Sequence, residues 1–494
     1  MEQYGLFIDG EYRDAKAGGT IKSINPATEQ PWAEVASAGE ADVDDAVEAA
    51  RKAHASGVWR NKSYEERADI LAAVAEVING QGEALAAAEA QDGGGTIRKA
   101  SFADVPGAAG TFEYFAGLCR GYKDEEEFEE TVPVASRNIV RREPIGVCAG
   151  IVPWNFPMLM ASWKIAPALA AGNTVIIKPA SVTPVTALIL GQICKDAGVP
   201  DGVVNVVSGP GGVAGERLAS HPDVGKVAFT GSTEVGRRIM QLASGTIKKV
   251  TLELGGKSPN IILDDADLDT AALGACYGTF FHQGQVCESG TRVLVSENQH
   301  DELVDKMVSA CDRIQVGDPM DMMSTMGPMV SSNQLDTVER YVGLGREAGA
   351  ECVLGGDRPD MESGYYYNPT IFTGVDNGMR IAQEEIFGPV VSVIRYSDDE
   401  EAVRIANDSM YGLGGAVWSS DTERALSVAR RLETGTVWIN DYHMINVRFP
   451  FGGYKQSGVG RELGPWGMSA FQETKHIHVG EDTPDKIYFS ALFN

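Results

Sequence analysis

The chain has 494 residues, of which 43% are hydrophobic and 22% charged, proportions that are ordinary for a globular protein of two or three domains. Its 69 acidic residues outnumber its 42 lysines and arginines, and the resulting net charge of −27 opposes binding to nucleic acid or to an anionic membrane. No stretch reaches the ~20 apolar residues of a membrane span, and the first residues lack a signal-peptide pattern, so we expect a cytoplasmic protein.

The first elements are short strands and two helices. Residues 4–22 read as short strands with a turn at Asp9-Gly10, because aspartate followed by glycine favours a tight hairpin turn. Apolar residues at helical spacing predict one helix over 40–55 and a second, rich in alanine and leucine, over 64–90.

An acidic run, DEEEFEE, begins at Asp124 and is followed by alternating apolar residues. A charged run is usually a solvated loop, but the alternation favours a projecting hairpin over 124–144. Near the end, KHIHV at 475–479 reads as another short strand, and the last residues, KIYFSALFN, are apolar without a domain of their own. Free strand edges and apolar patches are typical of subunit contacts, so we expect a homodimer or homotetramer.

From residue 144 onward, apolar strand patterns alternate with helical patterns. The expected strands cover 146–152, 173–178, 203–207, 226–229 and 249–253, and the expected helices cover 160–171, 184–197, 212–220 and 234–243. A second alternating block follows from about 259 to 455. Alternation of this kind is typical of parallel sheets, so the expected fold class is α/β, with two doubly wound parallel-sheet domains and a small β arm.

The loops that follow the first set of strands are expected at one edge of the sheet, where open α/β sheets bind ligands. They are PWNFP (153–157), KPAS (178–181), SGPGGVAGE (208–216), FTGSTEVG (229–236) and LELGGKSP (252–259). A glycine-rich turn before a helix offers backbone N–H groups to a phosphate, and Ser232 adds a hydroxyl. Neither glycine-rich loop matches the G-x-G-x-x-G fingerprint, so a nucleotide site here is a variant of the dinucleotide fold.

Three polar side chains at these strand ends are candidates for chemistry. Lys178 closes a β-branched run, where it can reach ribose or phosphate oxygens, and Asn155 offers an amide donor between two aromatic residues. Glu253 stands between two leucines, and a carboxylate in apolar surroundings tends toward a raised pKa, which suits a general base. Each alone is as often a structural polar group; together they favour a site.

The seven cysteines are scattered, odd in number and without a CxxC pair or metal-ligand spacing. That pattern speaks against disulfide staples and a metal centre and for a reducing compartment. Six of them lie in apolar or helical patterns, where an unpaired thiol is a small buried hydrophobe. Cys287 differs because Gly284 and Gly290 bracket it and polar residues surround it, which is typical of a reactive thiol.

The strand-end loops, together with FFHQGQVCESGTR (280–292), EEIFGP (384–389) and PFGGYKQSGVGRELG (450–464), resemble the signature segments of the NAD(P)-dependent aldehyde dehydrogenase superfamily. The segments occur in the family's order and span residues from about 20 to 480. The spacing between Glu253 and Cys287 also resembles the family's. The resemblance implies oxidation of an aldehyde to a carboxylic acid with NAD+ or NADP+.

The resemblance also implies roles for individual residues. Cys287 would attack the aldehyde, Asn155 and the backbone N–H of Cys287 would form the oxyanion hole, and Glu253 would activate water to hydrolyse the thioester. Lys164 and Glu462 match a proton path from that base. The implied dinucleotide contacts are Val152, Pro153, Trp154, Lys178, Ser181, Gly211, Gly215, Phe229, Gly231, Ser232, Leu254, Glu385 and Phe387, and the implied aldehyde tunnel is lined by Phe156, Met160, Trp163, Phe281, His443 and Ile445.

The resemblance implies a division of the chain as well. The cofactor-binding domain, a variant Rossmann fold, is expected over 1–123 and 145–258, with 456–472 returning to it. The catalytic domain is expected over 259–455. Residues 124–144 and 473–494 are expected to form an oligomerisation arm and a C-terminal tail.

Two other readings are compatible with the resemblance. Acylating relatives pass the acyl group to coenzyme A instead of water, but they lack the carboxylate that Glu253 supplies here. A crystallin-like structural protein of the same fold would be marked by loss of the nucleophile or base, and neither is lost.

Cofactor and substrate preference depend on a few positions around the implied sites. Ser181 stands where many NAD-preferring members have glutamate, yet SGPGGVAGE supplies no arginine or lysine for a 2′-phosphate, so use of both cofactors is expected. Phe281 stands where succinic-semialdehyde members have arginine, which argues against a dicarboxylic semialdehyde. His443 and Arg448 favour an oxygenated or aromatic aldehyde, and Glu288 leaves an aminoaldehyde or betaine aldehyde open.

Overall fold

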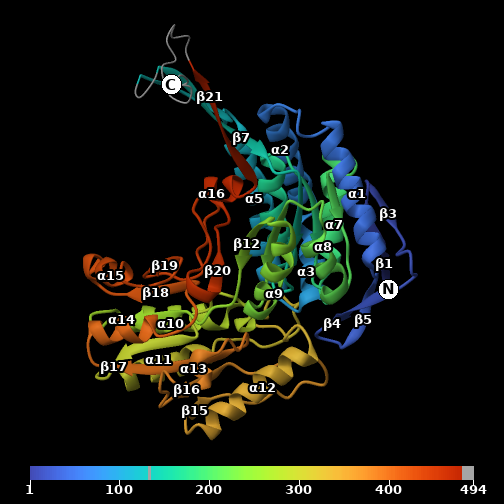
Figure 1. The fold of residues 1–494 in the computed structure, drawn as a ribbon. Coiled ribbons are helices and arrows are strands. Elements are labelled where there is room, and N and C mark those ends of the chain that lie inside the picture. Colours follow the sequence, from blue (N-terminus) through green and yellow to red (C-terminus); the bar gives the residue numbers. More distant parts are fainter. Residues whose placement is uncertain (132–134, 481–494) are drawn as a thin grey trace.

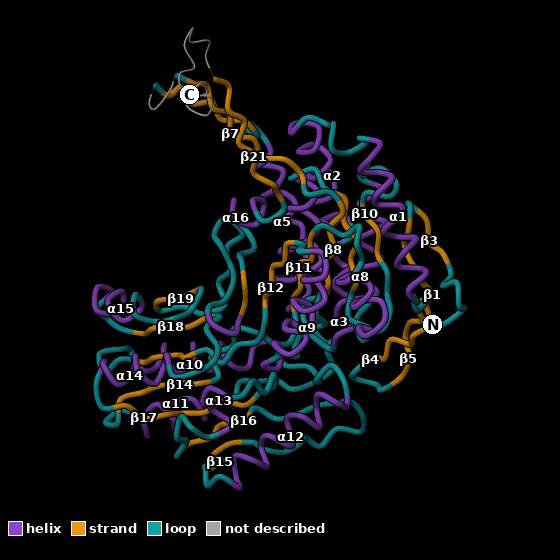
Figure 2. Tube along the Cα trace, in the orientation of Figure 1, coloured by secondary structure: helices purple, strands orange, loops and turns teal. Residues whose placement is uncertain are grey.

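The computed structural model describes residues 1–131 and 135–480, which form two sheet-centred bodies and a projecting ribbon (Figure 1). Helices cover both faces of each large sheet, and the ribbon leaves the first body beside α2 and α5 (Figure 2). This arrangement confirms the expected α/β fold class with a small β arm. No helix among the described residues is long and apolar enough to cross a membrane.

The first large sheet holds eight strands within the described residues, five of them parallel neighbours. Their order across the sheet is β20 (Gly458–Val459), β12 (Lys249–Glu253), β11 (Lys226–Thr230), β8 (Val147–Ile151), β9 (Thr174–Lys178), β10 (Val204–Val206), β2 (Leu6–Ile8) and β3 (Glu11–Arg13). A separate small sheet has the order β1 (Glu2–Tyr4), β5 (Gln30–Ala36) and β4 (Thr20–Asn25). The predicted turn at Asp9-Gly10 joins β2 to β3.

Both faces of this sheet are buried because alternate strand residues point to opposite sides. In β9, Val175 and Ile177 join one core and Ile176 joins the other. One face is covered by α1 (Glu40–Ser56), α8 (Glu216–Ser220) and α9 (Thr233–Ala243), and the other by α2 (Tyr64–Gly80), α3 (Gly82–Gly93), α5 (Val105–Cys119), α6 (Pro157–Ala170) and α7 (Val185–Asp196). The short helix α4 (Ile97–Lys99) contacts α3, and the short helix α16 (Gly464–Ser469) contacts α6.

Two predicted helices differ from the structure. The helix expected over 64–90 begins at a capping box, in which Ser63 and Glu66 bond each other's backbone, but it ends at Gly80. Gln81 leaves the helical conformation between two glycines, which have weak helix propensity, and α3 starts afresh at Gly82. The helix expected over 212–220 begins as a π-helical turn at 211–215 and becomes α-helical only from Glu216.

The second large sheet has seven strands in the part of the chain that is described, all parallel except for β15. Their order is β15 (Glu351–Leu354), β16 (Thr370–Thr373), β17 (Val390–Tyr396), β14 (Arg292–Ser296), β13 (Pro259–Ile262), β18 (Gly414–Trp418) and β19 (Thr436–Ile439). One face is covered by α10 (Leu268–Phe280) and α11 (His300–Cys311), and the other by α12 (Ser332–Glu347), α13 (Arg380–Gln383), α14 (Asp399–Asn407) and α15 (Thr422–Ala429).

The projecting ribbon confirms the predicted hairpin and the late strand. β6 (Glu125–Glu130) pairs with β7 (Ser136–Pro144), and β7 pairs along its length with β21 (Gln472–Gly480), both antiparallel. β21 is an edge strand among the described residues, and Ile477 and Val479 are exposed on it. The predicted subunit contact of the apolar tail falls on 481–494, outside the described residues.

Candidate active site

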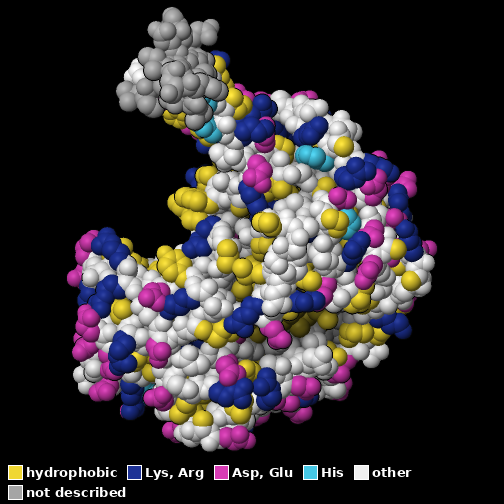
Figure 3. All heavy atoms as spheres, in the orientation of Figure 1, with side chains coloured by type: hydrophobic (Ala, Val, Ile, Leu, Met, Phe, Trp, Pro, Cys, Tyr) yellow, Lys and Arg dark blue, Asp and Glu magenta, His cyan; other side chains and the backbone are white. Residues whose placement is uncertain are grey.

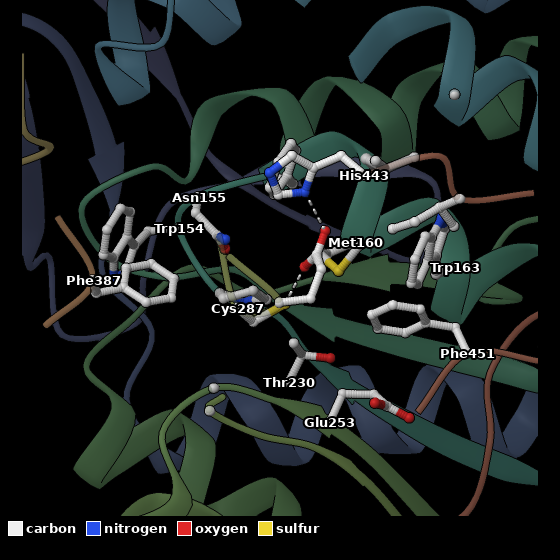
Figure 4. Close-up of a pocket in the computed structure, with 18 of the residues that line it drawn as sticks. Trp154, Asn155, Met160, Trp163, Thr230, Glu253, Cys287, Phe387, His443 and Phe451 are labelled. Carbon is white, nitrogen blue, oxygen red and sulfur yellow. Dashed lines mark hydrogen bonds and ion pairs between the residues drawn. The ribbon is translucent and has the colours of Figure 1, made fainter. Parts of the chain in front are cut away.

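The site lies where the carboxyl ends of the first sheet meet a loop of the second. β11 and β12 pair with Thr230 opposite Glu253, which places both side chains at this edge. Asn155 belongs to the loop between β8 and α6, and Cys287 to the loop between α10 and β14. Figure 4 shows these four residues around one cavity, whose volume is about 610 Å³.

A strained turn precedes the predicted nucleophile. His282 and Gln283 have φ angles of 49° and 56°, in the left-handed region that costs a non-glycine residue about 1 kcal/mol or more. The Gln283 amide donates to the carbonyls of Gly94 and Pro328 at 2.9 and 3.0 Å, and both atoms lie in segments far along the chain. These hydrogen bonds hold the turn in its strained form and so fix the loop that carries the thiol.

The Cys287 thiol is half-buried and lines the cavity. Its Sγ donates a hydrogen bond to Glu288 Oε2 at 3.1 Å. Burial, and then the neighbouring Glu288 carboxylate, raise the pKa of the Cys287 thiol well above its ordinary value. The resting group is therefore a thiol, which has to lose its proton before it can act as a nucleophile.

Asn155 is held with its amide directed toward Cys287 (Figure 4). The side chain is buried, and Nδ2 donates to the carbonyl of Gln285 at 2.8 Å. An amide nitrogen carries two hydrogens, so one N–H remains for an oxygen in the cavity. The arrangement suits an oxyanion hole because the donor is buried and held by a hydrogen bond.

Glu253 ends β12 as a buried carboxyl group without a hydrogen-bond partner on either oxygen among the described residues. Burial, and then the charge of Glu462, raise the pKa of Glu253 well above its ordinary value. Its Oε1 lies 2.7 Å from the place that a side chain on Gly452 would occupy, and Figure 4 shows the carboxyl directed away from Cys287. A side chain at 452 would therefore displace this carboxyl group from its present position.

A buried ion pair lies next to Glu253. The Lys164 ammonium contacts the Glu462 carboxylate at 2.6 Å and donates to Thr230 Oγ1 at 2.7 Å. Both charged side chains are almost fully buried, and their charges act on Glu253 in opposite directions. The structure thus brings together the two residues predicted for a proton path and sets them beside Glu253, the predicted base.

The predicted aldehyde-facing residues all line the cavity; they are Phe156, Met160, Trp163, Phe281, His443 and Ile445. The sequence reasoning missed Thr230, Tyr277 and Phe451, which also line it. Tyr277 lies one helical turn before Phe281, with ring centroids 5.4 Å apart, so helical spacing was a usable signal. No comparable local signal marks Phe451, whose ring packs edge-on against Trp163 at 5.4 Å.

His443 lines the cavity with a buried side chain. Its side chain is only 3% exposed, and Nδ1 lies 3.2 Å from Glu288 Oε1. The Glu288 side chain is 5% exposed, and His443 is its close polar partner. Arg448, by contrast, is exposed and is not among the residues that line the cavity.

Several predicted cofactor residues line the other part of the cavity. They are Pro153, Trp154, Gly231, Ser232, Leu254, Glu385 and Phe387. The Trp154 and Phe387 rings meet edge to face with centroids 5.1 Å apart. Glu385 Oε1 accepts the backbone N–H of Gly256 at 3.0 Å, and burial raises the pKa of Glu385 to about 7.

The remaining predicted cofactor residues are not part of the cavity lining; they are Val152, Lys178, Ser181, Gly211, Gly215 and Phe229. Cδ of the buried Lys178 side chain lies 3.5 Å from the position that a Cβ atom on Gly215 would take. The Lys178 backbone carbonyl accepts the Val152 N–H at 3.0 Å. The Ser181 hydroxyl donates to the Gly209 carbonyl at 2.9 Å, and the Phe229 ring lies directly beneath Gly231. These contacts place five of the six together along the carboxyl edge of the first sheet, and Gly211 opens the neighbouring π-helical turn.

Comparison with known proteins covers nearly the whole chain. The sequence signature of the aldehyde dehydrogenase family matches residues 12–477. Betaine aldehyde dehydrogenase of Bacillus subtilis is 46% identical over 96% of this chain and 96% of that protein, and an aldehyde dehydrogenase of Aspergillus niger is 45% identical over 96% and 94%.

Solved structures match equally well. Betaine aldehyde dehydrogenase from Staphylococcus aureus, in complex with NAD+, has a TM-score of 0.95 and 39% identity over 97% of this chain and 95% of that one. The NAD+ complex of an aldehyde dehydrogenase from Bacillus cereus has a TM-score of 0.94 and 43% identity, with 97% of each chain covered. On the family signature, the level of identity and the shared fold, the chain belongs to the aldehyde dehydrogenase family.

Proposed function

We propose that this aldehyde dehydrogenase oxidises an apolar or aromatic aldehyde to the carboxylic acid by a hydrolytic mechanism centred on Cys287. The observation that carries the proposal is the convergence of Cys287, Asn155 and Glu253 on one largely apolar cavity. A thiol supplies a covalent handle, an amide donor stabilises an oxyanion, and a carboxyl group of raised pKa suits activation of water.

The residues present fit a dinucleotide such as NAD+. Helix α9 starts at the exposed Ser232, whose side chain caps it by accepting the Val235 N–H, and the other N–H groups of the first turn are available to a phosphate. Lys178 is buried, and among the described residues its ammonium group donates a hydrogen bond only to the Pro179 carbonyl. Burial lowers the pKa of Lys178 to about 8. A ribose hydroxyl would satisfy its remaining donors. NAD+, when bound, supplies the acceptor for the hydride that leaves the aldehyde carbon.

The reaction begins with addition of the Cys287 sulfur to the aldehyde carbon, which forms a thiohemiacetal. The carbonyl oxygen gains negative charge in this step, and the free Asn155 N–H and the backbone N–H of Cys287 would stabilise it. Loss of hydride from the same carbon leaves a thioester on Cys287.

Glu253 then acts on the thioester through water. The ionised carboxylate takes a proton from a water molecule as its oxygen attacks the acyl carbon, and the sulfur leaves as the acid is released. The Lys164 and Glu462 pair lies beside Glu253 and is suited to carry that proton away. This carboxylate favours hydrolysis over transfer to coenzyme A, and the retained thiol and base favour an enzyme over a structural protein.

The cavity walls support an uncharged, apolar substrate. Phe156, Trp163, Phe281 and Phe451 present aromatic surface, and Glu288 is already paired with His443. A second candidate is betaine aldehyde or an aminoaldehyde, because aromatic rings also attract a cationic headgroup and the relative from Bacillus subtilis is named for betaine aldehyde.

The cofactor is proposed to be NAD+, with NADP+ also accepted. NAD+ is the ligand named for the complexes from Staphylococcus aureus and Bacillus cereus. The small side chain of Ser181 leaves room beside the Gly209 carbonyl and brings no charge that would repel a 2′-phosphate. A small, neutral residue at position 181 is therefore compatible with either cofactor.

The domain division, assembly and location stay proposals. The cofactor-binding domain would comprise 1–123, 145–258 and 456–472, and β20 from the last segment pairs with β12. A homodimer or homotetramer would use the free edge of β21, where Ile477 and Val479 are exposed. Seven free cysteines support a reducing compartment such as the cytoplasm.

A substrate screen tests the function. Aliphatic, aromatic, betaine, amino and dicarboxylic aldehydes are each offered with NAD+ or NADP+, and reduced cofactor is followed by absorbance. We expect the highest kcat/KM for aliphatic or aromatic aldehydes with NAD+. A preference for betaine aldehyde would select the second candidate, and absence of turnover with every aldehyde would refute the function.

A further inference from the structure

Glu288 and His443 form a polar pair against Cys287 that the mechanism above leaves unused. One carboxylate oxygen of Glu288 accepts the Cys287 thiol at 3.1 Å, and the other lies 3.2 Å from His443 Nδ1. The far nitrogen of the ring, Nε2, lies 3.1 Å from the Gly278 carbonyl. The three side chains thus form a continuous hydrogen-bonded chain that ends on the reacting sulfur.

The hydrogen-bond partners indicate the direction of each hydrogen bond in this chain. The Gly278 carbonyl can only accept, so His443 Nε2 must carry a hydrogen. An ionised Glu288 can also only accept, so Nδ1 is the donor toward this carboxylate. Burial acts to raise the pKa of Glu288, but the hydrogen bonds from His443 and Cys287 and the charge of His443 together lower it below its ordinary value, so the carboxylate is the ionised partner.

The backbone holds both members in place. His443 has a φ of 62°, a left-handed conformation that costs a non-glycine residue about 1 kcal/mol or more and that turns its ring into the site. The Tyr442 hydroxyl donates to the Glu288 carbonyl at 2.8 Å. The ring of His443 also packs against Tyr277 and Phe281, with centroids 5.4 and 5.3 Å away.

We infer that Glu288 is the base that removes the Cys287 thiol proton, and that His443 is a positioning residue that keeps the Glu288 carboxylate ionised. Given the proposed function, on which this inference rests, the two carboxyl groups divide the work. Glu288 prepares the nucleophile, and Glu253 prepares the water.

The proton balance closes over one turnover. As the sulfur–carbon bond forms, the thiol proton passes from Sγ to Glu288 Oε2 and the carbonyl electrons move to oxygen. The proton stays on Glu288 while hydride leaves. When water adds to the thioester and the sulfur departs as a thiolate, the proton returns from Glu288 to Sγ. The proton released by the new acid leaves by way of Glu253.

The substitution Glu288→Gln tests whether the Glu288 carboxylate takes the thiol proton or takes no part in the reaction. A spectator carboxylate only raises the thiol pKa, so its removal would leave the rate unchanged or increase it. Removal of a base slows sulfur addition by about 10²-fold, the lower end of general-base contributions. The readout is the rate of the first NADH burst in stopped flow with excess aldehyde, and Glu288→Asp should recover part of that rate.

The control variant is Glu297→Gln, which removes an exposed carboxylate just after β14 and should leave the burst unchanged. Nucleotide binding and thermal melting of Glu288→Gln confirm that the variant is folded. A burst rate in Glu288→Gln that equals or exceeds the wild-type rate would overturn the inference. Absence of any NADH formation by the wild-type protein with every aldehyde would instead refute the proposed function.

His443→Phe tests the positioning role through a pH profile. The phenyl ring keeps the packing against Tyr277 and Phe281 but removes the N–H donor, so burial alone then raises the Glu288 pKa. The base works only when ionised, so the burst rate should fall about tenfold at neutral pH and recover as the pH rises. The other titratable groups that act on this cluster are Cys287, Tyr277, Tyr442, Glu253 and Glu385.

Those groups are unchanged by the substitution, so a double variant isolates Glu288. In the Glu288→Gln background, His443→Phe should have no further effect on the pH profile of the burst. An equal shift in both backgrounds, or no shift in either, would contradict the role given to His443.

Discussion

The two carboxyl groups on either side of Cys287 lie in opposite environments. Glu288, from the second sheet, has the Cys287 thiol and the His443 ring as partners, and its pKa is lowered. Glu253, from the first sheet, has no hydrogen-bond partner among the described residues, and its pKa is raised. A paired, ionised carboxylate in contact with the thiol can accept its proton as the sulfur–carbon bond forms, whereas an unpaired one is free to bind the water that arrives later.

The largest expected effect is the loss of both roles together in Cys287→Ala. Without the sulfur neither carboxyl group has an acyl intermediate to act on, so turnover should fall by about 10⁴-fold or more. Binding of NAD+, measured by calorimetry, should stay near the wild-type value because the thiol makes no part of the proposed cofactor contacts. Turnover within about tenfold of wild type would remove Cys287 from the mechanism.

Glu253→Gln should separate the step assigned to Glu288, formation of the thioester, from the step assigned to Glu253, its hydrolysis. Steady-state turnover is expected to fall by about 10²- to 10⁴-fold because the thioester is no longer hydrolysed by activated water. The stoichiometric NADH burst should persist, because Glu288 still takes the thiol proton. If burst and steady state fall together, Glu253 acts before hydride transfer and the division of labour fails.

The pH dependence of turnover should report Glu253 when hydrolysis limits the rate. A base works only when ionised, so turnover should fall as the pH drops through the raised pKa of Glu253. Glu462 raises this pKa by its charge, so Glu462→Gln should move the acid limb toward lower pH. The displacement should be on the order of one pH unit, and an unmoved limb would show that another group titrates.

Much of this comparison follows from the sequence. Asn155, Glu253 and the residues near Lys178 fall at strand ends, and parallel strands bring such ends to one edge, so their proximity is predictable. The pairing of Glu288 with His443 is not, because 155 positions separate the two and no periodic pattern connects them. It depends on the positive φ of His443, which only the folded loop imposes.

The fold shows the same limit on a smaller scale. Apolar spacing predicts that residues 64–90 are helical, and most of them are. The break at Gln81 depends on the relative cost of two flanking glycines and on packing against the rest of the domain, which the pattern of one segment does not contain.

Ser181→Glu, at the far end of the proposed cofactor site, should have the smallest effect on the steps assigned to Glu288 and Glu253. A carboxylate there would repel the 2′-phosphate of NADP+, so the ratio of kcat/KM for NAD+ over NADP+ should rise by roughly tenfold or more. Burst and hydrolysis with NAD+ should be unchanged. An unchanged cofactor ratio would place discrimination elsewhere.

The most direct test of the account is the mass of the protein after one turnover. Wild type, Glu253→Gln and Glu288→Gln are mixed with NAD+ and one aldehyde, quenched in acid within the time of the wild-type burst, and weighed by intact mass spectrometry. The account predicts an acyl group on Cys287 of Glu253→Gln and little or none on Glu288→Gln. Equal acylation of the two variants, or none in Glu253→Gln, would contradict it.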